Sequence, residues 1–227
     1  MKPTRQYLNV ILQILRKDLQ VEWRGRQGFP VMLVFALMII FLFNFALQLT
    51  PDLQTGLAAG LLWVALAFAA TLGFNRSSNS ERETLALDGL LLAPVDRSAI
   101  FFGKTLSNFA STVLVALILL PVISLFYGLN MLQLPLILIV LLGLGAYTSL
   151  GTLLAALSVQ ARTRDVLLPV LLFPLALPIL IAAVEASRGV LAGQTLAENQ
   201  SWLLLILAAN VLFAAAGLTL FEIILEE

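Results

Sequence analysis

The sequence predicts an all-α membrane protein with six transmembrane helices, and three observations support this. Apolar residues make up 60% of the 227 residues, charged residues only 11%, and the mean hydropathy is +1.00. A soluble domain of ordinary composition carries about 25% charged residues. Six apolar stretches contain no Asp, Glu, Lys or Arg, and each is close to the ~20 residues that a helix needs to cross the hydrocarbon core.

These stretches define a single transmembrane domain over residues 1–227. We expect helices and not barrel strands, because the stretches are continuously apolar and do not alternate. The six predicted spans are residues 29–49, 57–74, 105–129, 132–159, 166–184 and 202–221.

The basic residues predict how the spans are oriented. Of the 13 Lys and Arg residues, 12 lie before the first span, between the second and third spans, or between the fourth and fifth. Only Arg188 lies on the other side. Because Lys and Arg concentrate in cytoplasmic loops, we expect both termini to be cytoplasmic.

The segment before the first span predicts an amphipathic helix at the membrane interface, over residues 5–26. Apolar residues recur there at helical spacing: Leu8, Ile11, Leu15, Leu19 and Trp23. Such a helix lies along the headgroups and is held by basic and aromatic side chains. The expected anchors are Arg16, Lys17, Trp23, Arg24 and Arg26. The alternative is a basic tail that only sets topology.

A coupling segment, residues 75–104, forms the longest polar stretch. Ser80 and Glu83 match a capping box, which predicts that a short helix starts there. Pro94 ends that helix, and Asp96 is placed to cap a helix that continues through Lys104 into the third span. Leucines lie on one side of the short helix, at positions 87, 90 and 91. The segment is either a linker that touches the headgroups or a docking element for a soluble partner.

The coupling segment also carries a family resemblance. Residues 81–94 read ERETLALDGLLLAP, followed by Gly103-Lys104, and this resembles the run after the second span of ABC-2-type exporter permeases. The sequence departs from that pattern at Ala86, Leu87 and Ala93. The resemblance implies the ABC-2-type permease fold, with a short coupling helix that docks on a partner ATPase. The docking residues it implies are Glu81, Arg82, Glu83, Leu85, Leu87, Asp88, Leu90 and Leu91.

Within these permeases, the chain most resembles the CcmB family, the haem-exporter permeases of cytochrome c maturation. Residues 167–181 read LLPVLLFPLALPILI, similar to a proline-rich run in that family's fifth span, but Ala182-Ala183 departs from it. The resemblance implies a multi-pass protein of the bacterial inner (plasma) membrane. It also implies four partners: a CcmA-like ATPase, a CcmC-like haem-handling membrane protein, a small CcmD-like membrane subunit and a second copy of the chain.

Several residues inside the predicted spans have two interpretations. One predicted helix contains three prolines, Pro169, Pro174 and Pro178, and we expect it to be kinked or locally broken. The distortion forms either a hinge or cavity wall, or only a packing feature. Asn44 and Asn210 hold helices together or bind substrate. A small-residue face in the fourth span serves close helix packing or contact with a second copy. Its glycines are Gly143, Gly145 and Gly151.

Between the last two spans, the resemblance implies short helices in the outer loop, residues 186–201. Arg188 and Glu198 in this loop are either solvated or in contact with a partner.

The residue types that are missing exclude most enzyme classes. There is no His and no Cys, so the chain supplies no Ser-His-Asp triad, no Cys/His zinc site and no usual axial haem ligand. It has no phosphate-binding loop. We therefore expect no cofactor on this chain, ATP on a partner subunit and haem handled by the complex. Balanced charge gives no reason to expect nucleic acid. The alternative function is an ABC-2-type permease for a lipid, glycan or drug.

Overall fold

The computed structural model describes residues 3–25, 28–46, 51–83, 96–158 and 164–224. Within these ranges it contains seven helices and no strand, and six of the helices are long and apolar enough to cross a membrane. The predicted all-α fold with six spans is confirmed. The helices are α1 (Pro3–Gly25), α2 (Gly28–Ala46), α3 (Pro51–Glu83), α5 (Arg97–Tyr127), α6 (Leu134–Leu157), α7 (Arg164–Leu191) and α8 (Gln200–Ile224).

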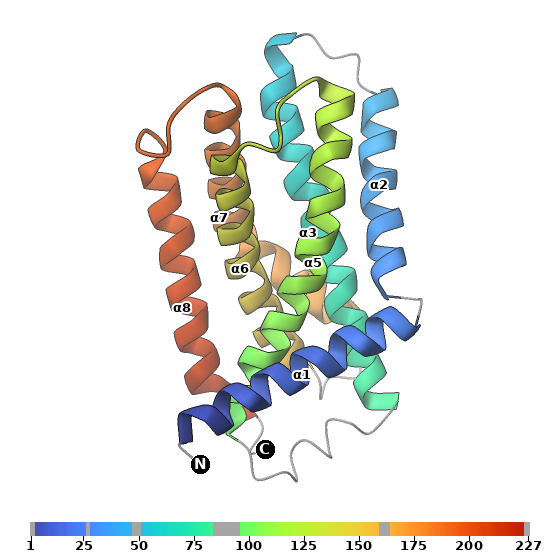
Figure 1. Cartoon of the computed structure of the whole chain (residues 1–227), viewed down its shortest axis with the longest axis vertical. Coiled ribbons are helices and arrows are strands. Elements are labelled where there is room, and N and C mark those ends of the chain that lie inside the picture. The colour runs from blue at the N-terminus through green and yellow to red at the C-terminus, as the bar shows by residue number, and fades with distance from the viewer. Residues whose placement is uncertain (1–2, 26–27, 47–50, 84–95, 159–163, 225–227) are drawn as a thin grey trace.

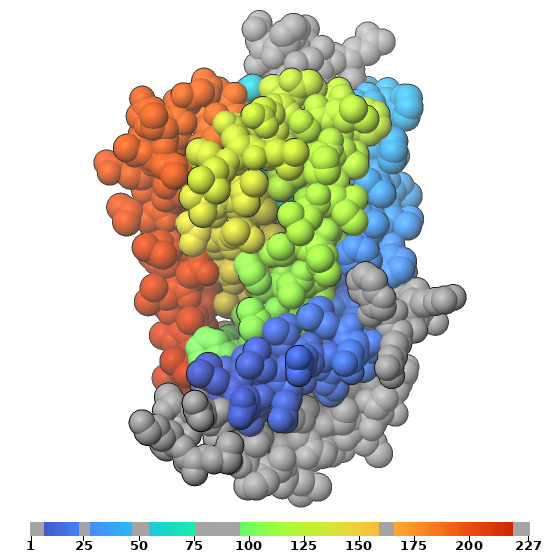
Figure 2. All heavy atoms as spheres, viewed as in Figure 1, coloured from blue at the N-terminus to red at the C-terminus, as the bar shows by residue number. Residues whose placement is uncertain are grey.

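The six spanning helices stand side by side, and α1 lies across one end of the bundle (Figure 1). The innermost helices are α3 and α6, since 67% of the spanning part of each is buried, against 17% for α2 and 11% for α8. The two outer helices lie at opposite edges of the molecule (Figure 2). They present apolar side chains outward, as helices in contact with lipid do.

Two helices are longer than their apolar stretches predicted. The predicted capping box at Ser80 is wrong, because α3 continues through Ser80 to Glu83. Residues 75–80 are polar but contain neither Gly nor Pro, so nothing in them forces the helix to end. Likewise α7 runs on to Leu191, and residues 192–199 form turns and not the expected short helices. Glu185 and Arg188 end the apolar run but pair with each other one turn apart, so the helix continues.

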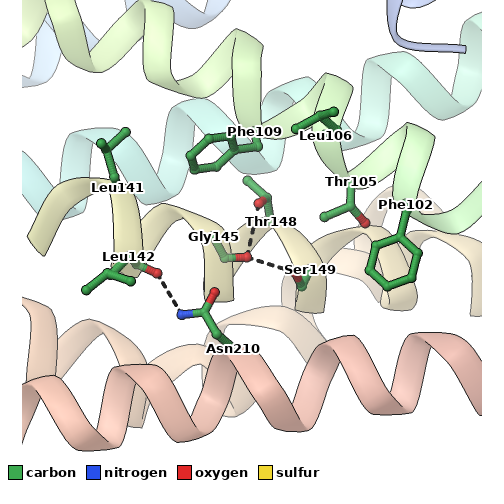
Figure 3. A pocket seen from close by; sticks show the side chains of 10 residues that line it. All are labelled: Phe102, Thr105, Leu106, Phe109, Leu141, Leu142, Gly145, Thr148, Ser149 and Asn210. Carbon is green, nitrogen blue, oxygen red and sulfur yellow. Dashed lines mark hydrogen bonds between the residues drawn. The ribbon is translucent and has the colours of Figure 1, made fainter. Parts of the chain in front are cut away.

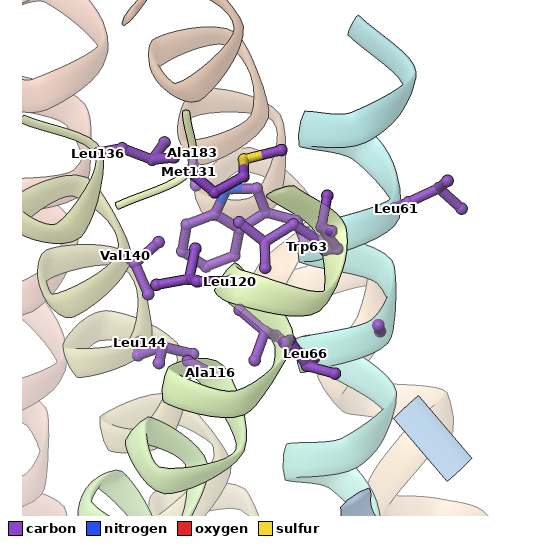
Figure 4. Packing of buried hydrophobic residues seen from close by; sticks show 14 of the residues in the cluster. Leu61, Trp63, Leu66, Ala116, Leu120, Met131, Leu136, Val140, Leu144 and Ala183 are labelled. Carbon is purple, nitrogen blue, oxygen red and sulfur yellow. The ribbon is translucent and has the colours of Figure 1, made fainter. Parts of the chain in front are cut away.

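The core depends on aromatic rings that lie against glycines. Trp63 of α3 packs against Gly143 of α6, and Phe74 packs against Gly151; a Cβ at either glycine would overlap the ring. Leu120, Met131 and Val140 are buried in the same cluster as Trp63 (Figure 4). The small-residue face of the fourth span therefore serves packing within the chain, as predicted.

Some polar groups inside the bundle form hydrogen bonds between helices. The Trp63 indole Nε1 donates to Ser187 Oγ of α7 at 3.0 Å. Asn210 Nδ2 of α8 donates to the Leu142 carbonyl of α6 at 2.9 Å, which confirms that this residue holds helices together. Asn44 lies half-buried near the end of α2. These bonds join buried polar groups where no water is present to replace them.

Candidate coupling site

The predicted docking residues fall mostly outside the described part of the chain. Leu85, Leu87, Asp88, Leu90 and Leu91 lie in residues 84–95 and are outside it. The backbone of Glu81, Arg82 and Glu83 forms the end of α3. The structure therefore shows the two ends that flank this stretch, the end of α3 and the start of α5, and how α5 is held.

The start of α5 is fixed by the predicted cap. Asp96 Oδ1 accepts a hydrogen bond from Ser98 N at 3.0 Å and another from Ser98 Oγ at 2.6 Å. The first of these satisfies one of the backbone donors that have no partner within a helix. Ser98 Oγ also lies 3.0 Å from Tyr7 OH in α1. A chain of three side chains thus joins the cap of α5 to α1.

Close packing along α5 holds α1 in place. Ile14 is buried, and a Cβ on Gly103 would lie 2.9 Å from the Ile14 Cβ. Ile14 shares a core cluster with Ile100 and Phe101. The small residue at position 103 lets the two helices approach closely, as small residues do at helix crossings.

Only part of the apolar face predicted for α1 is exposed. Leu8 is 56% exposed, whereas Ile11, Leu15 and Leu19 are half-buried. Leu12, which the predicted face did not include, is 52% exposed. One face of α1 therefore packs on the bundle while another is free for lipid. This supports the interfacial helix and not an unstructured basic tail.

A carboxylate of α1 is inserted against the bundle, which sequence reasoning missed. Glu22 is half-buried and accepts a hydrogen bond from Ser111 Oγ of α5. Burial raises the pKa of Glu22 above its ordinary value of 4.5; the Ser111 bond opposes this, and the Asp18 charge adds to it. The only signal in the sequence is the acidic pair Asp18 and Glu22, four residues apart within a basic segment, which places both on one helix face.

The predicted interfacial anchors are only partly described. Arg16 is exposed, and Lys17 forms an ion pair with Asp18 at 3.1 Å. The side chains of Trp23 and Arg24, and all of Arg26, lie outside the described part. Their role at the membrane interface remains a prediction.

The three prolines lie within a continuous helix. The sequence predicts a helix that is kinked or locally broken. Because α7 is unbroken from Arg164 to Leu191, the expectation of a local break is wrong, and the kink stays a prediction. Figure 1 shows the paler, lower part of α7 slanting behind α6. Pro169 is half-buried, whereas Pro174 and Pro178 are exposed on the outer side of the helix. A hinge at these prolines remains a prediction.

On the opposite side of the bundle, the two charged residues of the predicted outer loop have partners within the chain. Arg188 pairs with Glu185. Glu198 accepts hydrogen bonds from Thr195 N at 2.6 Å and Thr195 Oγ1 at 2.9 Å. Arg188 therefore pairs within α7, Glu198 stabilises the turn between α7 and α8, and both side chains remain in contact with solvent.

Comparison with known proteins decides the family. The model of the family described as "CcmB protein" matches residues 9–222, from within α1 to within α8. The chain belongs to the CcmB family. The matched residues cover the six spans and include residues 81–94, on which the resemblance was based.

Curated relatives of this CcmB-family chain are 30–32% identical to it over the aligned residues. A protein named heme exporter protein B from Rhodobacter capsulatus is 31% identical over 181 residues, covering 77% of this chain and 81% of the relative. The protein of the same name from Haemophilus influenzae is 30% identical over 175 residues, covering 77% and 79%. That from Paracoccus denitrificans is 32% identical over 181 residues, covering 79% and 83%.

Proposed function

We propose that this CcmB-family chain is the membrane (permease) subunit of an ATP-driven ABC transporter complex of cytochrome c maturation. The complex couples ATP hydrolysis by a partner ATPase to haem export or to release of a haem-loaded chaperone. The family match over residues 9–222 carries the proposal, and the relatives named heme exporter protein B support the substrate. The six spans suit a permease.

The residue types of the chain support a division of labour with partners. Because this chain has no phosphate-binding loop, we assign ATP hydrolysis to another subunit. Because it has no His and no Cys, the usual ligands of haem iron also come from other subunits. This chain then supplies the membrane helices and the surface that receives the ATPase. The proposed partners are a CcmA-like ATPase, CcmC-like and CcmD-like membrane proteins and a second copy of the chain, in the bacterial inner membrane with both termini cytoplasmic.

The contacts at the α1 end of the bundle support a route for the coupling. The ATPase binds the residues between α3 and α5, and a push on them moves the capped start of α5. Because Ser98 contacts Tyr7 and Gly103 packs on Ile14, α1 and the start of α5 move together. A rigid pair of helices transmits a displacement better than a loop does.

The test uses the complex purified in mild detergent from cells that produce every subunit. Leu87→Asp or Leu90→Asp places a charge on the leucine side of the coupling segment, and we expect most of the co-purified ATPase to be lost. Leu92→Asp, on the other side of the predicted coupling helix by helical spacing, is the matched control and should retain the ATPase. A wild-type complex without haem absorbance, or an ATPase that stays bound and active in Leu87→Asp and Leu90→Asp, would contradict the proposal.

A further inference from the structure

Three helices, α5, α6 and α8, line an open cavity of about 310 Å³ near α1. The surface is hollowed between α8 and α5 at this place (Figure 2). Both α8 and this part of α5 present exposed leucines, among them Leu106, Leu204 and Leu212. The cavity therefore opens on the side of the bundle that meets lipid. Its lining includes Phe102 near the end of the coupling segment, but none of the predicted docking residues.

Polar side chains lie toward one end of the cavity, among apolar ones. Leu141 and Leu142 lie at the other end, Thr105 and Ser149 lie beside Leu106 and Phe102, and Asn210 lies between the two ends (Figure 3). Thr105 is eight residues from the start of α5, so the polar end lies nearer to α1. A ligand that fits this lining has a polar group near the membrane surface and an apolar tail toward the membrane centre.

Hydrogen-bonding capacity is left unused inside the cavity. Thr105 Oγ1 is buried and has no hydrogen-bond partner within the described part of the chain. The amide nitrogen of Asn210 binds two carbonyls, while its Oδ1 points into the cavity (Figure 3). A Cβ on Gly145 would lie only 2.7 Å from that oxygen, so the glycine keeps the space open. Buried hydroxyl groups nearly always have a partner, and a ligand oxygen would provide one.

Position and charge narrow the kind of ligand. Because the cavity opens on the side of the bundle that meets lipid, the hydrocarbon chain of a lipid is the apolar group that can enter it. None of the lining residues is charged, so an ionic headgroup finds no partner inside, whereas an ester or hydroxyl oxygen does.

We propose that this cavity binds one acyl chain of a membrane phospholipid. The Thr105 hydroxyl turns from its buried position toward the cavity and donates a hydrogen bond to an ester oxygen of the lipid, and the chain runs past Asn210 toward Leu141 and Leu142. The bound chain fills the gap between α8 and α5 and so completes the packing of α8, which is otherwise the least buried span. This function is independent of which substrate the complex exports.

The test is photocrosslinking in the full complex, reconstituted in bilayer discs of a phospholipid with a diazirine on its acyl chain. We expect crosslinks to concentrate on peptides that contain residues 102–109 and 141–149. Leu106→Trp fills the cavity and should remove most of this labelling. Leu117→Trp is the matched control, because Leu117 is exposed on α5 but does not line the cavity, and its labelling should equal that of the wild type.

A second variant separates lipid binding from folding. Thr105→Val keeps the shape of the side chain and removes a hydroxyl that has no partner in the described chain. We expect roughly threefold less crosslinking from the loss of one hydrogen bond, with a melting temperature in detergent no lower than that of the wild type. Even labelling of all exposed helices, or labelling unaffected by Leu106→Trp, would overturn the proposal. So would displacement of the label by added haem, which would make the cavity a haem site. Because ATPase co-purification is scored separately, failure here leaves the proposed function standing.

Discussion

The indole ring of Trp63 in α3 lies directly against the backbone of Gly143 in α6, with no room for a side chain at position 143. The contact joins the two most buried spans. Lipid is as apolar as the side chains, so the hydrophobic effect does not drive helices together within the membrane. Close van der Waals packing such as this holds them together instead. The contact also places the Trp63 Nε1 next to Ser187 of α7, so one side chain joins three helices.

Gly143→Ala should destabilise the bundle by about 1–3 kcal/mol, the usual effect of overfilling a packed core. The measurement is thermal unfolding in detergent. Gly60→Ala is the control: Gly60 is in the same helix as Trp63, but a Cβ there would have nothing within 4 Å. We expect that variant to equal or slightly exceed the wild type, because alanine favours the helix. Equal losses in the two variants would show that the Trp63 contact contributes little.

Glu22 makes the attachment of α1 depend on pH. Its pKa is raised above 4.5 in the folded protein, so the folded state holds the proton more tightly than the unfolded state does. This contribution is fully present below about pH 4.5 and is lost as the pH rises through the folded pKa. In Glu22→Gln, stability should therefore fall less with rising pH across this window.

The pH experiment has a control in Glu198. Its hydrogen bonds to Thr195 lower the pKa of Glu198 below 4.5, so its titration lies below the window in which Glu22 acts. Glu198→Gln should thus leave the slope above pH 4.5 unchanged. Melting temperatures measured from pH 4.5 upward check both variants, and a Glu22→Gln curve parallel to the wild type would show that the buried carboxyl is not linked to folding.

Asp96→Ala should loosen the start of α5 by about 1 kcal/mol, the typical effect of losing an N-cap. Hydrogen exchange of the amides of residues 98–100 is the measurement, and we expect it to be faster. Asp96→Asn retains an oxygen that can cap the helix and should preserve most of the protection. If the asparagine variant exchanges as fast as the alanine variant, the charge of Asp96 matters and the capping oxygen does not.

Pro174→Ala tests whether α7 works as a hinge. Proline has no backbone donor, so the carbonyl four residues earlier lacks its helical partner, and alanine restores that bond and stiffens the helix. We expect slower ATP hydrolysis in the assembled complex and an unchanged melting temperature, since Pro174 is exposed. Leu175→Ala, at an exposed neighbouring position, serves as the control. Unchanged hydrolysis in Pro174→Ala would leave only a packing role.

Features that depend on a local pattern could be predicted from the sequence. The uncharged apolar runs were enough to predict the six spans. An Asp just before the expected start of a helix was enough to predict the cap at Asp96. The family resemblance rested on residues 81–94 and 167–181, and the family match over residues 9–222 confirms it. The packing role of Gly143 and Gly151 was predicted from residue size alone, because few other functions need so many small residues on one face.

Features that depend on contacts between distant helices could not be predicted. Hydropathy located the ends of the apolar runs, but α3 and α7 continue past them because polar residues can extend a helix into solvent. The inward position of Glu22 depends on Ser111, 89 residues later. The cavity depends on Gly145 meeting Asn210 of another helix. Spacing along a single segment contains no information about such pairs.

The attachment of α1 to α5 also sets an order of assembly. Ile14 cannot reach its place until Gly103 has been synthesised and inserted, which takes about 4–18 s for 89 residues at roughly 5–20 residues per second. During that interval α1 has no protein surface on which to bury Ile14. The exposed leucines Leu8 and Leu12 give the new helix a hold on the membrane surface until the third span arrives. The N-terminal helix is therefore made first and docked late.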